Sequence, residues 1–409
     1  METAKFHQTT LSNGLTIIGE EKMSSQSVGL GFFVKTGARD ETPDIAGVSH
    51  FLEHMMFKGT DKRSAIDINF AFGGIGAQAN AYTSEESTVY YAAVLPEYLP
   101  ELLDILSDML RPKLDSGEFS TEKKVILEEI ALYQDRPTHV LFESALRGYF
   151  SDHPAGNSVL GSHESISALP VEKMREYFNR RYSPKNIVLT ASGNFNWEEL
   201  TTLAAKLCGH WVGEKTARST PQHRPTESRN QIVRKDQQLA HICMLGPGPS
   251  ANAEFRYDLN VLATILGDHS GSQFYWQLVD KGLAESASFD INEMDGTGFF
   301  MAYASAEPDR IAEVESIARK IISQAVNFSD AELERAKTKV RTRMVLSSES
   351  AMRRLFAVGN EWLYRAAYRT VGEEIQRLAA VNKASIHKAL EEYPFKPFHT
   401  ATLSPRETL

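Results

Sequence analysis

The chain has 409 residues, of which 42% are hydrophobic and 24% are charged, so it can bury a large core and form more than one domain. The formal net charge of −9 argues against a nucleic-acid backbone or an anionic membrane as the main partner. Only two cysteines, no signal-like N-terminus and no apolar run near the about 20 residues that span a bilayer predict a soluble, cytoplasmic protein.

Apolar alternation and helical periodicity predict a chain in which strands and helices are mixed. Pro137 should interrupt the longest helical stretch. The predicted strands cover about Leu15–Ile18, Val28–Val34, Asn80–Val94 and Ile187–Ala191, and the predicted helices cover about Ile45–Phe57, Glu97–Leu110, Phe119–Phe150 and Trp197–Cys208. Strands mixed with long helices favour an α+β architecture.

A polar stretch near the middle of the chain predicts a linker. Residues 213–230 contain two prolines, many charges and almost no large apolar side chains. We therefore predict an N-terminal domain over residues 1–212, a linker over 213–235 and a C-terminal domain over 236–409.

The two halves share residues at a constant offset of 212 positions. A repeat of this length, inside similar strand-then-helix patterns, indicates a duplicated domain, because the units of a solenoid are shorter. The identical pairs are Pro96 and Pro308, Tyr91 and Tyr303, Ala92 and Ala304, Gly59 and Gly271, and Glu122 and Glu334.

The segment from His50 to His54 carries the strongest chemical signal. On a helix, His50, Glu53 and His54 share one face, because they stand at positions i, i+3 and i+4. Two neutral imidazoles at this spacing can bind one zinc ion, and the ion lowers the pKa of its bound water toward about 7. Glu53 can then accept the proton of that water. This order of residues is the HxxEH arrangement of inverzincins.

The alternative is a surface helix whose histidines and glutamate face water, since three fixed positions often occur together by chance. Apolar neighbours on most sides of the polar stripe favour a buried helix instead, and buried charges need partners or a metal. A catalytic zinc takes a third protein ligand, and the segment around Glu122 and Glu129 is the best candidate. These carboxylates are seven residues apart and point the same way, although an ordinary charged helix would show the same spacing.

Three ordered sequence blocks resemble the pitrilysin family, which includes insulin-degrading enzyme and the mitochondrial processing peptidase. The blocks are residues 47–60 (GVSHFLEHMMFKGT), 80–91 (NAYTSEESTVYY) and 125–129 (VILEE), and the resemblance extends over nearly the whole chain. It implies a zinc metalloendopeptidase with one Zn²⁺ per chain. The implied ligands are His50, His54 and Glu129, and the implied general base is Glu53.

The same resemblance assigns three further residues. Glu122 matches a glutamate that supports the ligands from outside the metal's coordination sphere. Asn80 and Ala81 match positions on a strand edge where the substrate backbone pairs as an added strand. From the residues alone, Asn80 could equally be a turn residue.

For the fold, the resemblance implies two homologous α+β domains, each a mainly antiparallel sheet packed with helices, that form half of a clamshell chamber. At the offset of 212, apolar or basic residues replace the site residues of the first domain. The replacements are Leu262 for His50, Ile265 for Glu53, Leu266 for His54 and Arg341 for Glu129. The second domain should therefore hold no metal.

One departure from the family pattern affects the expected partner. The family has an Arg and a Tyr seven residues apart that hold substrate and stabilise the oxyanion, whereas this chain has Leu278 and Glu285. We therefore expect a heterodimer with a homologous subunit that supplies the pair, with a homodimer as the alternative. The expected substrates are peptides or unfolded polypeptides, with no nucleic-acid or membrane partner. Two other hypotheses are a non-catalytic structural or binding subunit of the same family and a zinc amidase for small molecules.

Overall fold

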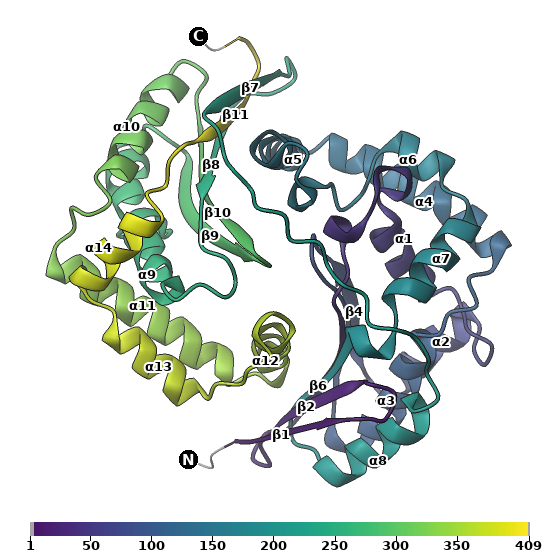
Figure 1. The fold of residues 1–409 in the computed structure, drawn as a ribbon. Helices are drawn as coiled ribbons and strands as arrows, with labels where there is room; N and C mark the ends of the chain where they lie inside the picture. Colours follow the sequence, from purple (N-terminus) through teal and green to yellow (C-terminus); the bar gives the residue numbers. More distant parts are fainter. Residues whose placement is uncertain (1–3, 408–409) are drawn as a thin grey trace. The chain divides into compact units, whose positions relative to one another are not determined.

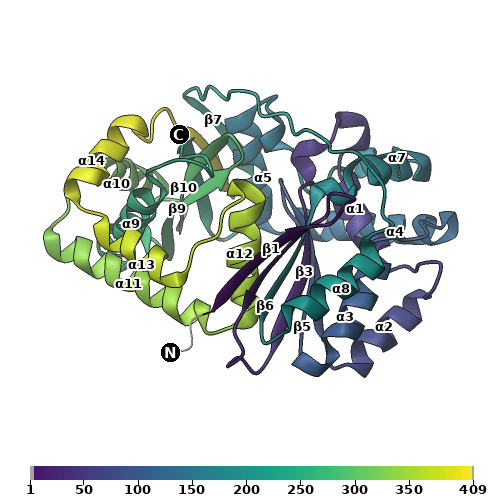
Figure 2. The same ribbon diagram turned by 60° about the horizontal axis from the view of Figure 1, so that its bottom comes forward.

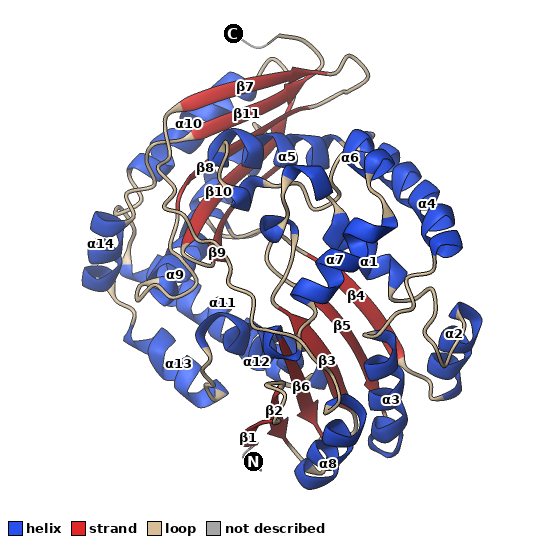
Figure 3. Ribbon diagram, turned by 45° about the vertical axis from the view of Figure 1, so that its right-hand side comes forward, coloured by secondary structure: helices blue, strands red, loops and turns tan. Residues whose placement is uncertain are grey.

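The computed structural model describes residues 4–407, which group into two compact units. Unit 1 comprises the residues up to Ala131, Asn157–Ser219 and Leu346–Thr370, and unit 2 comprises Leu132–Gly156, Thr220–Val345 and the residues from Val371 on. Each unit combines one sheet with several helices (Figures 1 and 3). Within residues 4–407, no helix is both long enough and apolar enough to cross a bilayer.

The sheet of unit 1 has the strand order β1-β2-β6-β3-β5-β4. Neighbouring strands run antiparallel, except that β2 and β6 run parallel. Every residue of β3 is buried, as expected for a central strand that is covered on both faces. The strands are β1 (Lys5–Thr10), β2 (Thr16–Glu21), β3 (Val28–Val34), β4 (Gln78–Thr83), β5 (Thr88–Val94) and β6 (Ile187–Gly193).

The helices of unit 1 pack mainly against this sheet and against one another. Helix α3 contacts β3 and β5, α8 contacts β2, and α1 contacts β4 and β5. The helices are α1 (Val48–Met55), α2 (Ala65–Gly74), α3 (Leu99–Met109), α4 (Ser116–Gln134), α6 (His163–Ala168), α7 (Val171–Arg181), α8 (Trp197–Cys208) and α12 (Ala351–Arg365). The last residues of α4, from Leu132 on, are grouped with unit 2.

The sheet of unit 2 has the order β7-β11-β8-β10-β9, with β7 and β11 parallel and the other pairs antiparallel. Its strands are β7 (Ser228–Val233), β8 (Ala240–Pro247), β9 (Ser286–Met294), β10 (Thr297–Ala306) and β11 (His399–Ser404). Its helices are α5 (Pro137–Phe150), α9 (Arg256–Gly267), α10 (Ile311–Ser323), α11 (Asp330–Ser348), α13 (Val371–Ala380) and α14 (Lys383–Glu392), with a π-helical turn at Tyr275–Val279.

The five strands of the unit 2 sheet repeat the topology of the unit 1 sheet without β1. The order β7-β11-β8-β10-β9 matches β2-β6-β3-β5-β4, including the single parallel pair. Adding 212 to the bounds of β2 gives 228–233, which are the bounds of β7. The predicted fold class, two homologous α+β domains with mainly antiparallel sheets, is therefore confirmed.

Each unit also contains one helix from the other half of the sequence. Helix α5 contacts β8 and β11 of unit 2, and α12 contacts β3 and β6 of unit 1 (Figure 2). On α12, Arg354 donates hydrogen bonds to both carboxylate oxygens of Glu20 in β2. The division into residues 1–212, 213–235 and 236–409 stays a prediction, and the compact units differ from it by exchanging the segments around α5 and α12.

Candidate metal centre

The HxxEH segment lies on α1, whose start is fixed by local backbone contacts. Gly47, just before the helix, has φ +89°, and a side chain there would place its Cβ 2.6 Å from the carbonyl oxygen of Leu160, so only glycine fits. The buried Glu41 carboxylate accepts hydrogen bonds from the backbone N–H groups of Gly47 (2.6 Å) and Ser49 (2.7 Å). These bonds satisfy amides of the first turn, which lack partners inside the helix.

Helix α1 is buried on its apolar sides. Phe51 stacks on Phe119 of α4, with ring centroids 4.6 Å apart. The apolar residues around the polar stripe are buried, namely Val48, Phe51, Leu52, Met55 and Met56. The alternative of a surface helix with its polar groups facing water is therefore wrong, since His50 itself is only 8% exposed.

Two helices of unit 1 bring three potential metal ligands together. His50 Nε2 lies 3.8 Å and His54 Nε2 lies 3.6 Å from Glu129 Oε2 on α4, and these ligand atoms all lie within 4.8 Å of one another. Such separations are too long for hydrogen bonds. They are close to the about 3.3 Å between donors around a tetrahedral zinc with bonds of about 2.0–2.1 Å. The donor set and its spacing therefore fit Zn²⁺.

The two imidazoles are held in a form that can bind a metal. Burial, and then the neighbouring His54, lower the pKa of His50 to about 4, so its ring is neutral at pH 7. Among the described residues, the buried Nδ1 of His50 has no hydrogen-bond partner. His54 Nδ1 lies 2.9 Å from Glu122 Oε1, and since an ionised carboxylate only accepts, this nitrogen carries the proton. The Nε2 atom of His54, which lies on the side of Glu129, is therefore unprotonated and has a free lone pair.

Glu122 is almost fully buried and bridges two residues of the region around α1. Besides His54, it accepts a hydrogen bond from Lys58 Nζ at 2.6 Å. Burial raises the pKa of Glu122, but the bonds from Lys58 and His54 outweigh it and hold the pKa below its usual value. An ionised Glu122 can orient His54, which agrees with the supporting position predicted for it.

Glu53 lies beside the ligands and has one hydroxyl partner. Thr83 at the end of β4 donates a hydrogen bond from Oγ1 to Glu53 Oε2 at 2.6 Å. Burial raises the pKa of Glu53, and the bond from Thr83 and the nearby His54 oppose this shift without cancelling it. A carboxylate with a raised pKa is a better proton acceptor at neutral pH.

Asn80 and Ala81 lie on β4, which is the last strand of the unit 1 sheet. They pair in register with Tyr91 and Tyr90 of β5, and Asn80 Oδ1 accepts a hydrogen bond from the Ala81 N–H at 2.8 Å. Among the described strands, only β5 pairs with β4, so one edge of β4 can accept another strand.

The corresponding helix of unit 2 has a different character. Leu262, Ile265 and Leu266 of α9 are buried in the apolar core of unit 2. Across residues 4–407, His50, His54 and Glu129 form the one group of histidine, cysteine and carboxylate side chains spaced to hold a metal. That unit 2 holds no metal stays a prediction.

A lysine contact that occurs in both units shows which residue of unit 2 is equivalent to Glu129. Lys123 of α4 donates to the carbonyl oxygen of Leu169, and Lys337 of α11 donates to that of Val381 in the same way. The offset on this helix is therefore 214 (337 − 123), which places Arg343 opposite Glu129 instead of Arg341. Both are arginines, so the loss of the ligand is unchanged. The pairing of Glu122 with Glu334 is wrong, however, because the same offset places Ala336 (122 + 214) opposite Glu122.

The two positions that depart from the family pattern lie in unit 2. Leu278 is fully buried in the core of that unit, and Glu285 is exposed just before β9. Neither side chain offers the hydrogen-bond donors of an Arg and Tyr pair.

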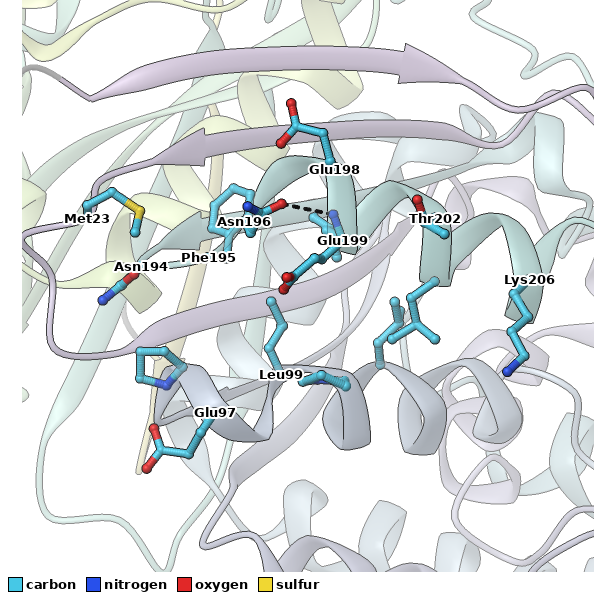
Figure 4. Close-up of a pocket in the computed structure, with 15 residues that line it drawn as sticks. Met23, Glu97, Leu99, Asn194, Phe195, Asn196, Glu198, Glu199, Thr202 and Lys206 are labelled. Atoms are coloured by element: carbon cyan, nitrogen blue, oxygen red, sulfur yellow. Dashed lines mark hydrogen bonds between the residues drawn. The ribbon is translucent and has the colours of Figure 1, made fainter.

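A hollow in unit 1 lies between α3 and α8 (Figure 4). Its volume is about 810 Å³, and its lining is mostly apolar, with Leu99, Leu103 and Leu200 among the residues. None of the predicted site residues lines it. The candidate centre is therefore defined by converging side chains and not by this cavity.

Sequence reasoning missed three residues that hold the site in place: Glu41, Lys58 and Thr83. Lys58 stands four residues after His54, a spacing that would have suggested a shared face. Thr83 falls within the block at residues 80–91, but nothing in the sequence indicates its contact with Glu53. Glu41 has no sequence signal that we can identify.

Comparisons with known proteins identify the family of this chain. Residues 16–163 match the family model described as insulinase (peptidase family M16), and residues 168–340 match the model described as peptidase M16 inactive domain. A protein of Bacillus subtilis named as an uncharacterized zinc protease is 30% identical, covering 97% of each chain. A protein of Streptomyces coelicolor with the same description is 31% identical over 91% of this chain and 84% of its own.

Solved structures show the same fold. A protease from Helicobacter pylori superposes with a TM-score of 0.91 at 20% identity, covering 99% of this chain and 100% of its own. A protein described as peptidase M16 inactive domain from Pseudomonas fluorescens superposes with a TM-score of 0.92 at 14% identity, covering 99% of each chain.

Proposed function

Because this chain belongs to the insulinase family, peptidase family M16, we propose that it is a zinc-dependent endopeptidase subunit that hydrolyses peptides or unfolded polypeptides. The observation that carries the proposal is the convergence of His50 Nε2, His54 Nε2 and Glu129 Oε2, with the Glu53 carboxylate on the same helix. The relatives named as zinc proteases support the choice of metal.

Each residue has a distinct task in the proposed reaction. His50, His54 and Glu129 would hold the ion, which, when bound, would lower the pKa of a water molecule and polarise the scissile carbonyl. Glu53 accepts the proton of the attacking water and later delivers it to the leaving amine, so that protons balance over the cycle. Glu122 keeps the proton of His54 on Nδ1 and thus fixes the ligand's orientation.

We also propose that the free edge of β4 binds substrate. An extended peptide that adds to this edge would pair with backbone groups near Asn80 and Ala81. Backbone pairing does not depend on side chains, which suits an enzyme that cuts unrelated sequences. Thr83, at the end of the same strand, lies within hydrogen-bond distance of Glu53, which supports a cleavage position at that end.

A homologous partner subunit is the remaining part of the proposal. Leu278 and Glu285 cannot stabilise an oxyanion, because a buried aliphatic chain and a carboxylate donate no hydrogen bond. We infer that a second chain supplies these donors and closes a chamber around the substrate. The family resemblance supports the chamber, and co-purification from the native source tests the partner.

The catalytic proposal is tested on the purified chain, alone and with its partner. Zinc content is measured by mass spectrometry, and cleavage of a quenched fluorescent peptide is measured before and after chelation. We expect one Zn²⁺ per chain, loss of cleavage with chelator and recovery with added zinc. Glu53→Gln should keep the zinc and lower kcat by about 10²–10⁴-fold. Zinc binding without cleavage under any partner condition would favour the non-catalytic subunit instead.

A further inference from the structure

The hydrogen bond from Thr83 to Glu53 joins the strand that we assign to substrate and the helix that bears the base. Thr83 Oγ1 donates to Glu53 Oε2 at 2.6 Å. Within residues 4–407, Thr83 is the one hydrogen-bond partner of the Glu53 side chain. Because this bond occupies one carboxylate oxygen, it leaves the other oxygen to accept a proton.

We propose that Thr83 is a positioning residue that orients Glu53 for proton transfer. The inference rests on the proposed function, in which Glu53 is the general base. A glutamate side chain has several rotatable bonds, and a fixed donor at one oxygen selects one orientation from them. A shift of about 1 Å in a reacting group can cost about 100-fold in rate.

The hydroxyl of Thr83 is well suited to this task, because the hairpin that carries it is anchored by backbone and side-chain bonds. Thr83 pairs with Thr88 across the β4–β5 ladder, and the turn between them is closed by the bond from Ser84 N–H to the Ser87 carbonyl oxygen at 2.8 Å. Glu86 of this turn accepts a hydrogen bond from Arg39 Nη1 at 2.5 Å, and both side chains are buried. The turn is thereby anchored inside unit 1.

The same strand carries the proposed substrate edge. Asn80 and Ala81 precede Thr83 by only two or three residues on β4. The position of the substrate backbone and the orientation of Glu53 therefore depend on one structural element. Thr83 has this effect through Glu53 and need not contact the scissile bond.

Steady-state kinetics of Thr83→Val and Thr83→Ser provide the first test. Valine keeps the shape and loses the donor, so kcat should fall about 10- to 100-fold, while KM and zinc content stay within about twofold. Serine restores the hydroxyl and should return kcat to within about threefold of the wild type. Thr60→Val is the matched control, because Thr60 also donates to a carboxylate, that of Asp108 at 2.8 Å, outside the site. Unchanged kcat in Thr83→Val, or an equal loss in Thr60→Val, would overturn the proposal.

The second test does not use activity. In the metal-free protein, urea unfolding gives the change in unfolding free energy for Thr83→Val, Glu53→Ala and the double variant. These changes should be non-additive, because the two side chains are bonded to each other. Additive changes would refute the bond. Non-additive changes in a chain that cleaves no peptide would refute the proposed function and the positioning role with it, and would leave only a structural bond.

Discussion

Units 1 and 2 have the same topology but use the same helix in opposite ways. In unit 1, α1 directs His50 and His54 toward a carboxylate on α4. In unit 2, the equivalent positions on α9 are Leu262 and Leu266, and both are fully buried in the core. One scaffold thus holds converging side chains that could bind a metal in one copy and a closed apolar core in the other.

The end of the helix shows a second difference between the two units. Gly267 ends α9, and a Cβ at this position would lie 2.1 Å from the backbone nitrogen of Phe289 in β9. The offset of 212 places Met55 at the equivalent position of α1, where its side chain is buried. The helix of unit 2 therefore contacts its strand directly, whereas α1 has a side chain at this point. In unit 2, the apolar replacements on α9 and the close packing of α9 against β9 thus occur in the same helix.

The largest effect is expected when the site residues of α1 are replaced by the equivalent residues of α9. The triple variant His50→Leu, Glu53→Ile and His54→Leu should lower bound zinc from one ion per chain to none and abolish peptide cleavage, because it removes two ligands and the base. Mass spectrometry of the metal content measures the effect. His163→Leu, at an exposed histidine, should keep the zinc, and zinc retained by the triple variant would contradict the assigned ligands.

A second substitution tests the close packing in unit 2. Gly267→Ala should destabilise the protein by at least about 3 kcal/mol, because the new Cβ would overlap the backbone of Phe289. Urea unfolding gives the free energy. The control is Gly73→Ala near the end of α2, where a Cβ meets open space and should raise helix stability by up to about 1 kcal/mol. Equal stability of Gly267→Ala and the wild type would show that α9 and β9 separate at no cost.

A pH series tests whether the buried imidazole of His50, which is Leu262 in unit 2, is neutral in the folded protein. The pKa of His50 is about 4 in the folded chain and about 6.5 when unfolded, so between these values the unfolded state binds more protons. Stability of the metal-free protein should therefore fall as pH drops from about 6.5 to 4, by at most roughly 3 kcal/mol from this residue. The measurement is the difference between wild-type and His50→Leu unfolding free energies across the range. A pH-independent difference would contradict the buried, neutral His50.

The smallest expected effect concerns the residue that supports His54. Glu122→Gln removes the charge that holds the proton on His54 Nδ1, so zinc affinity should weaken by about 10- to 100-fold. Competition with a fluorescent zinc chelator measures the Kd. Glu128→Gln, at an exposed carboxylate on the same helix, should leave the Kd unchanged. An equal loss of affinity in this control would mean that the change in net charge, and not the contact with His54, weakens zinc binding.

Local patterns predicted much of the fold. The strand at Val28–Val34, the helix at Trp197–Cys208 and the break at Pro137 agree with the structure. The pattern over Asn80–Val94 is two strands, because the segment Ser84–Ser87 forms a tight turn that the alternation did not reveal.

Other elements gave no periodic signal. Helix α2 was not predicted, because its apolar residues lie on opposite faces. Ile68 and Phe72 are buried, whereas Ile66 and Phe70 are 67% and 72% exposed. Such a helix shows no amphipathic period. The exchange of α5 and α12 between the sequence halves could not be predicted either, since both helices have ordinary local patterns.

The site was predictable where chemistry follows from spacing. His50, Glu53 and His54 share a helix face, and the structure brings Glu129 to them as the resemblance implied. The contacts from Thr83 and Lys58 depend on how β4 and α4 pack against α1, which no local pattern contains. The roles of Asn80 and Ala81 stay predictions.

The exchange of α12 has a consequence for protein synthesis. The strands of unit 1 are complete at Gly193, but α12 ends at Arg365, so the ribosome must add 172 more residues (365 − 193) before the sheet has this helix. At about 5–20 residues per second, this takes roughly 10–30 s. During that time, the β3 surface around Phe33, which α12 covers in the finished chain, remains open to chaperones or to other nascent chains. The sheet of unit 1 is therefore translated first but is covered by α12 only after most of unit 2 has been made.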